Sequence, residues 1–221
     1  MSLLEIQSQW IRKFDEMSIK DTHHRLAAPF LSISDERTAV TRRGTIMLVG
    51  KATNKSWELE EFLSFSDRPI QERVEERCSV TRKHLENMRK KPSSAFWRFW
   101  RKLHEIGSPV IWTNLAKIGT ITRNPGCAVL DAQKELACET LKAEICEYKP
   151  SLVVITGDYA KNIIYSIWPQ KDWTISEYDR TTCWIIDKCD KSSILWTDHP
   201  QFKPLPRRDY WLKKARELMT S

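Results

Sequence analysis

The run Leu152-Val153-Val154-Ile155-Thr156-Gly157 decides the fold class of this chain. It is short, rich in β-branched residues and apolar up to its polar end, which is the pattern of a strand buried on both faces of a parallel sheet. Three further runs share this form: Ile46-Met47-Leu48-Val49-Gly50, Val110-Ile111-Trp112-Thr113-Asn114 and Ile194-Leu195-Trp196-Thr197-Asp198-His199-Pro200. Because segments with helical periodicity separate these runs, the sequence predicts an α/β fold.

We expect a three-layer sandwich in which helices flank a central, mainly parallel sheet of four strands. All 221 residues are expected to form one domain, with an N-terminal helix and an irregular, surface-wrapping segment over 1–44 and a core over about 45–221. Helices are predicted over 3–18, 69–90, 95–106, 131–148, 158–168 and 208–219. Residues 51–66 and 119–130 are predicted to be long loops, and 172–187 a small hairpin or an extra edge strand.

The charge balance points to a polyanionic partner. Lysine and arginine number 36 against 29 acidic residues, which gives a formal net charge of +7. A basic surface attracts polyanions and speeds their encounter. Cations also cluster along the chain, at 89–91, 98–102 and 207–214, although each cluster alone is more typical of a solvated helix face.

The cysteines and the hydropathy pattern bound the cellular setting. The six cysteines show no C-x-x-C spacing, and no secretory leader or membrane-length apolar run is present. We therefore expect reduced thiols in a cytoplasmic monomer that uses no cofactor, holds no metal and contacts no membrane.

Polar residues follow the predicted strands. Ligands bind beyond the carboxyl ends of the strands of an open parallel sheet, so Gly50, Asn114, Gly157 and His199 are expected to face one site. His199 can donate a hydrogen bond to a developing anion, and Asn114 offers a donor and an acceptor side by side to the edge of a base. The structural alternatives are that Asn114 ties down the following loop and that Asp198 holds His199.

The segment after the first strand carries a second set of candidates. Gly50 permits a close approach of a ligand to the backbone, and Lys51 and Lys55 add positive charge. Asn54 either orients a water molecule through its amide oxygen or caps a turn.

In their order and placement, these motifs resemble those of the uracil-DNA glycosylase superfamily over about residues 45–215. The family places a water-activating motif after its first core strand, a base-contacting Asn after the second and a His-Pro motif after the last. Segment 49–54, Asn114 and His199-Pro200-Gln201 stand at those places here. Segment 157–161 and Phe65-Ser66 resemble two further family segments; the Phe of the second stacks on the flipped base.

The resemblance implies a DNA glycosylase that hydrolyses the N-glycosidic bond of a flipped-out base and leaves an abasic site. His199 would stabilise the departing base, Asn54 would orient water, and Leu205 stands where relatives carry a wedge that fills the gap in the duplex. The partner implied is DNA, contacted through Lys51, Lys55, Lys161, Gln201, Leu205, Arg207 and Arg208.

The chain departs from the uracil enzymes at several positions. Ala52 stands where those enzymes have a water-activating Asp and relatives have Asn, and Glu58 and Asp198 are the nearest other carboxylates in the sequence. Gln201 replaces the usual Ser, and the Tyr that excludes the methyl group of thymine is missing. The expected substrate is therefore a deaminated, oxidised or modified base, including the modified pyrimidines of phage DNA.

Three alternatives stay open from the sequence. The first is a catalytically silent relative that binds DNA or a modified base. The second is an α/β enzyme that acts on a nucleotide or nucleoside, and the third is a glycosylase that uses Lys51 as a Schiff-base nucleophile.

Overall fold

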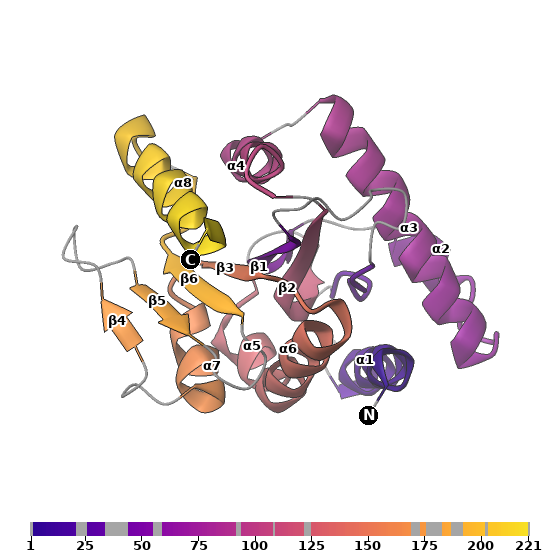
Figure 1. Cartoon of the computed structure of the whole chain (residues 1–221). Coiled ribbons are helices and arrows are strands. Elements are labelled where there is room, and N and C mark those ends of the chain that lie inside the picture. Colours follow the sequence, from indigo (N-terminus) through magenta and orange to yellow (C-terminus); the bar gives the residue numbers. More distant parts are fainter. Residues whose placement is uncertain are drawn as a thin grey trace.

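A computed structural model describes residues 2–20, 26–33, 44–54, 59–91, 94–107, 109–121, 125–168, 173–175, 183–186, 192–201 and 203–220. Its sheet has six strands in the order β2-β1-β3-β6-β5-β4 (Figure 1). The strands are β1 (Ile46–Asn54), β2 (Val110–Thr120), β3 (Leu152–Thr156), β4 (Trp173–Ile175), β5 (Cys183–Ile186) and β6 (Ser193–Thr197). The helices are α1 (Leu3–Lys20), α2 (Leu59–Leu63), α3 (Ile70–Lys90), α4 (Ala95–Leu103), α5 (Cys127–Asp131), α6 (Lys134–Tyr148), α7 (Ala160–Ile167) and α8 (Leu205–Thr220).

The four predicted strands, β2, β1, β3 and β6, pair in parallel, which confirms the predicted α/β fold with a parallel sheet between helices. The sheet is nevertheless wider than the four strands predicted. β5 and β4 add to β6 as an antiparallel hairpin, in agreement with the prediction for 172–187.

Each strand of the parallel sheet is buried on both faces, so the sheet separates two apolar clusters. Met47 and Val49 of β1 pack on the face covered by α1, α6 and α7, whereas Ile46 and Leu48 pack on the face covered by α4 and α8. This alternation follows from the period of two in a strand. The long helix α3 lies on the β2 side of the sheet (Figure 1) and contributes Val74 to the first cluster and Leu85 to the second.

The prediction of a surface segment is wrong for residues 26–33, which are buried. This segment runs beside the second half of β2: the amide of Phe30 donates to the carbonyl of Lys117 at 2.8 Å, and that of Ala27 donates to Gly119 at 2.9 Å. An antiparallel bridge joins Leu26 to Thr120. The segment therefore covers the open edge of the sheet, where unpaired backbone groups would otherwise face other chains.

Several predicted boundaries also change. β1 and β2 continue past Gly50 and Asn114 to Asn54 and Thr120, with an irregular register between Ala52 and Asn54. Asn114 therefore lies within a strand and not at its end. The predicted loops contain the short helices α2 and α5, and α8 begins at Leu205, three residues before the predicted start. Within the described part of the chain, no helix combines the length and the apolar character needed to cross a membrane.

Candidate functional site

The site is centred on a close contact between the neighbouring strands β1 and β2. Gly50 pairs with Asn114 in the parallel register. A Cβ atom on Gly50 would lie 2.5 Å from Oδ1 of Asn114 and 3.5 Å from Cζ of Phe96, which lies in the first turn of α4. Glycine at position 50 is therefore what allows the amide of Asn114 to lie across β1.

The amide of Asn114 is buried but incompletely bonded. The residue is 3% exposed, and its Nδ2 donates no hydrogen bond to the residues that the structure describes. A buried donor without an acceptor costs about 1–3 kcal/mol, so an acceptor atom on a ligand would be stabilised there. This observation argues against the alternative in which Asn114 ties down a loop.

His199 follows β6 and is held in a defined tautomer. Its Nδ1 accepts a hydrogen bond from the backbone amide of Gln201 at 3.2 Å, so Nδ1 carries no proton and Nε2 is the donor. Burial, and to a lesser degree the positive charge of Lys51, lower the pKa of His199 from its ordinary value. His199 is thus a neutral hydrogen-bond donor near neutral pH.

Gly157 and Phe96 complete the surroundings of His199. Gly157 directly follows β3 and has a φ of +92°, and a Cβ atom there would lie 3.8 Å from Cβ of His199. The ring of Phe96 lies nearly parallel to that of His199, with centroids 5.8 Å apart and an interplanar angle of 15°. Gly50, Asn114, Gly157 and His199 therefore converge as the sequence predicts, on the sheet face that α4 covers.

Phe96 is the site residue that the sequence analysis missed. Ser94 fixes the start of α4 by accepting a hydrogen bond from the amide of Trp97 at 3.4 Å, which places Phe96 at the site. Phe96 lies on the same helical stripe as Trp100 and Leu103, which are buried in the core. Its spacing alone is therefore that of an ordinary core residue.

The carboxylate of Asp198 forms ion pairs with two cationic side chains. The carboxylate is 9% exposed and lies 2.8 Å from Nζ of Lys203 and 3.0 Å from Nη1 of Arg207. These ion pairs brace the turn that carries His199. They also engage the carboxylate of Asp198, which the sequence offered as a substitute for the missing water-activating residue, and they hold Arg207 beside the site.

Other predicted residues are placed less directly. The backbone of Asn54 ends β1, but its side chain lies outside the described part of the structure, as do Lys55 and Glu58. Phe65 is half-buried in the turn after α2, with the guanidinium carbon of Arg68 4.0 Å from its ring centroid. The structure therefore leaves the roles predicted for Asn54 and Phe65 as predictions.

The predicted DNA contacts that the structure describes lie at or near the carboxyl edge of the sheet. Lys51 is half-exposed in β1, and Gln201 is exposed two residues after His199. Leu205 is 65% exposed at the start of α8, with Arg208 half-buried one turn later. Lys161 is exposed on α7, and its Nζ lies 5.6 Å from the ring of Tyr165.

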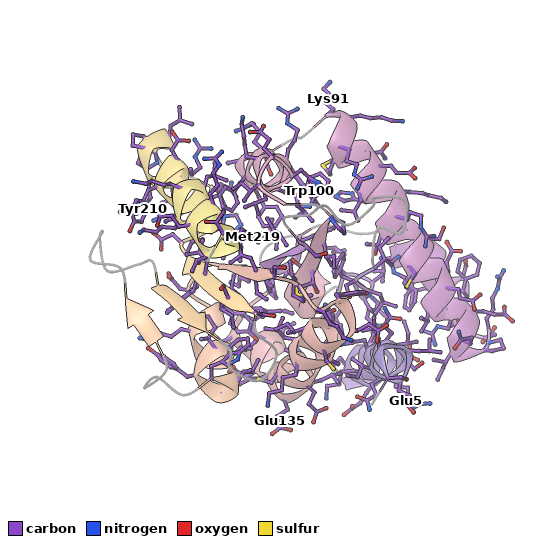
Figure 2. All side chains as sticks on the ribbon, in the orientation of Figure 1. Glu5, Lys91, Trp100, Glu135, Tyr210 and Met219 are labelled. Atoms are coloured by element: carbon purple, nitrogen blue, oxygen red, sulfur yellow. The ribbon has the colours of Figure 1, made fainter. Side chains whose placement is uncertain are left out.

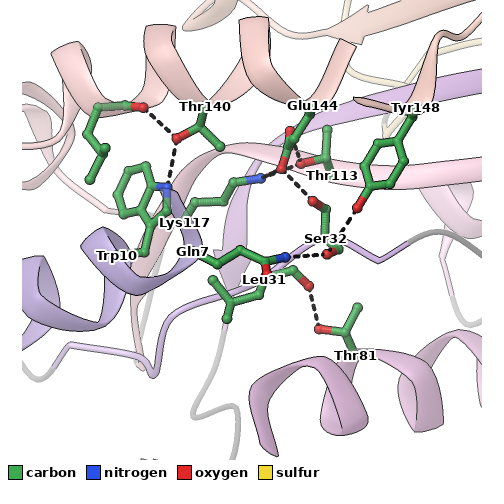
Figure 3. Close-up of polar contacts among 11 residues, drawn as sticks. Gln7, Trp10, Leu31, Ser32, Thr81, Thr113, Lys117, Thr140, Glu144 and Tyr148 are labelled. Atoms are coloured by element: carbon green, nitrogen blue, oxygen red, sulfur yellow. Dashed lines mark hydrogen bonds and ion pairs between the residues drawn. The ribbon is translucent and has the colours of Figure 1, made fainter. Parts of the chain in front are cut away.

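A buried polar network fixes β2 from the opposite face of the sheet (Figure 3). Nζ of Lys117 donates to Oε1 of Glu144 at 2.6 Å, and both side chains are 2% exposed. Glu144 also accepts hydrogen bonds from the hydroxyls of Thr113 at 2.8 Å and Ser32 at 2.5 Å. Burial lowers the pKa of Lys117, and Glu144 opposes this effect. The network joins β2, α6 and segment 26–33 behind Asn114.

The described residues contain no group of three His, Cys, Asp or Glu side chains that could hold a metal ion. No protein-family model matches the chain, and a search of curated proteins finds no significant match.

Proposed function

We propose that the chain is a DNA glycosylase of the uracil-DNA glycosylase superfamily, which hydrolyses the N-glycosidic bond of a flipped-out damaged, deaminated or modified base. The observation that carries the proposal is the buried amide of Asn114, whose Oδ1 lies over Gly50 and whose Nδ2 has no acceptor among the described residues, on the same sheet face as a neutral His199. DNA would be the partner and a cytoplasmic monomer the acting form. The free thiols of Cys78, Cys127, Cys138 and Cys146 support a reducing compartment.

Asn114 would select the base. Its amide presents Nδ2–H as a donor and Oδ1 as an acceptor, and the edge of a pyrimidine offers the complementary pair. Phe96 would supply a stacking face, and stacking on an aromatic ring contributes about 1–3 kcal/mol per base. These contacts would compensate for the few kcal/mol needed to take the base out of the duplex.

His199 would stabilise the leaving group. As the bond to the sugar breaks, negative charge develops on the base, and a neutral Nε2–H can donate a hydrogen bond to a base oxygen. A positioned donor of this kind contributes about 3–4 kcal/mol to the transition state in a site that excludes water. The bonded Nδ1 keeps the imidazole in the required tautomer.

The second candidate function is a catalytically silent protein that binds DNA or a modified base. Two observations favour it: Ala52 has no polar side chain at the position of the water-activating residue, and Asp198 is engaged by Lys203 and Arg207. In the glycosylase proposal, Asn54 orients the water.

The test is base release from duplex oligonucleotides that carry uracil, hypoxanthine, xanthine, hydroxymethyluracil, hydroxymethylcytosine or its glucosylated form. Alkaline cleavage reveals the abasic product. We expect product from at least one base, and a loss of at least about tenfold, or about 1.4 kcal/mol of barrier, for Asn114→Ala and for His199→Ala. Salt-sensitive binding with no product on any base would instead support the silent protein.

A further inference from the structure

The charges of the chain are divided unequally between the two helical layers. α4 carries Arg98, Arg101 and Lys102 and no carboxylate, whereas α8 carries five cations and two carboxylates. Each helix therefore has an excess of three positive charges, against +7 for the whole chain. On the other side of the sheet, α6 carries two lysines and four glutamates, and the charges of α1 balance.

The cations of α4 and α8 point to solvent. Arg98, Arg101 and Lys102 are exposed, because Trp97 and Trp100 take the buried side of α4. Lys213 and Arg216 of α8 are likewise exposed, opposite the buried side chains Trp211, Leu212 and Ala215. Figure 2 shows nitrogen-tipped side chains that extend outward around both helices.

Both helices start at the candidate site and run side by side away from it. Phe96, in the first turn of α4, lies beside His199, and α8 begins just after the turn that carries His199. Near the carboxyl end of α8, Met219 reaches the edge of the sheet at which the parallel strands begin. Its Cε would lie 3.7 Å from a Cβ atom on Gly44, which precedes β1. The rings of Phe99 and Trp211, with centroids 6.1 Å apart, join the two helices.

We propose that these exposed cations, here called the basic face (Arg98, Arg101, Lys102, Lys213 and Arg216), bind the phosphate backbone of duplex DNA that flanks the base held at Asn114. The inference rests on the proposed function for the identity of that base. Packed helices lie about 8–10 Å apart, so the basic face presents charge over a width that spans several phosphates of a duplex. The ion pair of Lys102 with Glu105, at 2.9 Å, is exposed on both sides and exchanges readily for a phosphate.

Duplex DNA fits the basic face better than an anionic membrane does. A helix that lies on a membrane inserts large apolar side chains beside its cations. Of the large apolar side chains that the structure describes as exposed, Leu205 is the one that belongs to α4 or α8, and it lies at the site end of α8.

The test compares two triple variants by fluorescence anisotropy with an undamaged, labelled duplex over a series of salt concentrations. Arg98→Gln/Arg101→Gln/Lys213→Gln removes three cations of the basic face. Arg12→Gln/Lys142→Gln/Lys149→Gln removes three exposed cations from the α1 and α6 side, so both variants have the same net charge. We expect the first variant to lose about 0.9 per phosphate contact, about 2.7 in all, from the slope of log K against log salt. The second should keep the slope of the unsubstituted protein.

An equal loss in both variants would overturn the inference, because bulk charge would then explain binding. Failure of the unsubstituted protein to bind the duplex, or tighter binding to phosphatidylserine vesicles than to the duplex, would overturn it as well. The duplex carries no damaged base, so this binding is measured independently of base release. Binding through the basic face, together with no product from any base of the oligonucleotide panel, would refute the glycosylase and leave this inference standing.

Discussion

Removal of the positive charge from the buried pair behind Asn114 should destabilise the protein severely. In the Lys117→Met variant, the carboxylate of Glu144 stays in an environment where its side chain is 2% exposed, with only the hydroxyls of Ser32 and Thr113 as donors. Removal of one partner from a buried ion pair costs about 3–5 kcal/mol. In a domain of this size, 1 kcal/mol shifts the melting temperature by about 2–4 °C, so we expect a decrease of about 6–20 °C.

The assay is thermal unfolding followed by circular dichroism at pH 7 for Lys117→Met, Glu144→Met and the double variant. The double variant buries no uncompensated charge, and replacement of a whole buried pair by apolar groups is often neutral or stabilising. Its loss of stability should therefore be smaller than the sum of the two single losses by at least about 2 kcal/mol, which is the coupling that a double-mutant cycle measures. Additive losses, or single losses below about 1 kcal/mol, would refute the reasoning that the two groups form a desolvated ion pair.

Three further predictions concern the site and the buried histidines. Gly50→Ala should displace the amide across β1, because its Cβ atom would lie 2.5 Å from that amide oxygen, and should reduce base release at least about tenfold, whereas Gly126→Ala, with open space around its Cβ position, should not. Because the pKa of His199 is lowered from its ordinary value of 6.5, any decline of base release through its protonation should have a midpoint below pH 6.5, and a midpoint above pH 7 would argue against a neutral donor. Burial lowers the pKa values of His84 and His104 from 6.5 to about 4, so the folded state binds fewer protons than the unfolded state between these values, and stability should be lost as pH falls from 6.5 to 4. The His84→Phe/His104→Phe variant should lose less stability than the unsubstituted protein over that pH interval, as measured by urea titrations.

The sequence was informative where a pattern is local. The apolar runs identified the parallel strands, and the parallel pairing of the first two runs places Gly50 beside Asn114, although both residues lie within their strands and not beyond the ends. The start of β2 after Pro109 was predicted, but its carboxyl end was not, because Lys117 is typical of a loop after an apolar run. It is tolerated in a buried strand only because Glu144 compensates its charge, and Glu144 is a partner distant in sequence. Phe96 was missed for a related reason, since its spacing is that of a core residue.

The segment over 26–33 has a consequence for the order of folding during synthesis. Phe30 leaves the ribosome 87 residues before Lys117, the residue whose carbonyl it bonds in the finished sheet. At about 5–20 residues per second, the apolar segment must wait roughly 4–17 s for its strand to be made. During that time Phe30 and Leu31 have no sheet to pack against, so they expose apolar surface on the nascent chain. The sealing of the β2 edge is therefore a late event, and slower translation between residues 33 and 110 should increase the fraction of chains that aggregate before they fold.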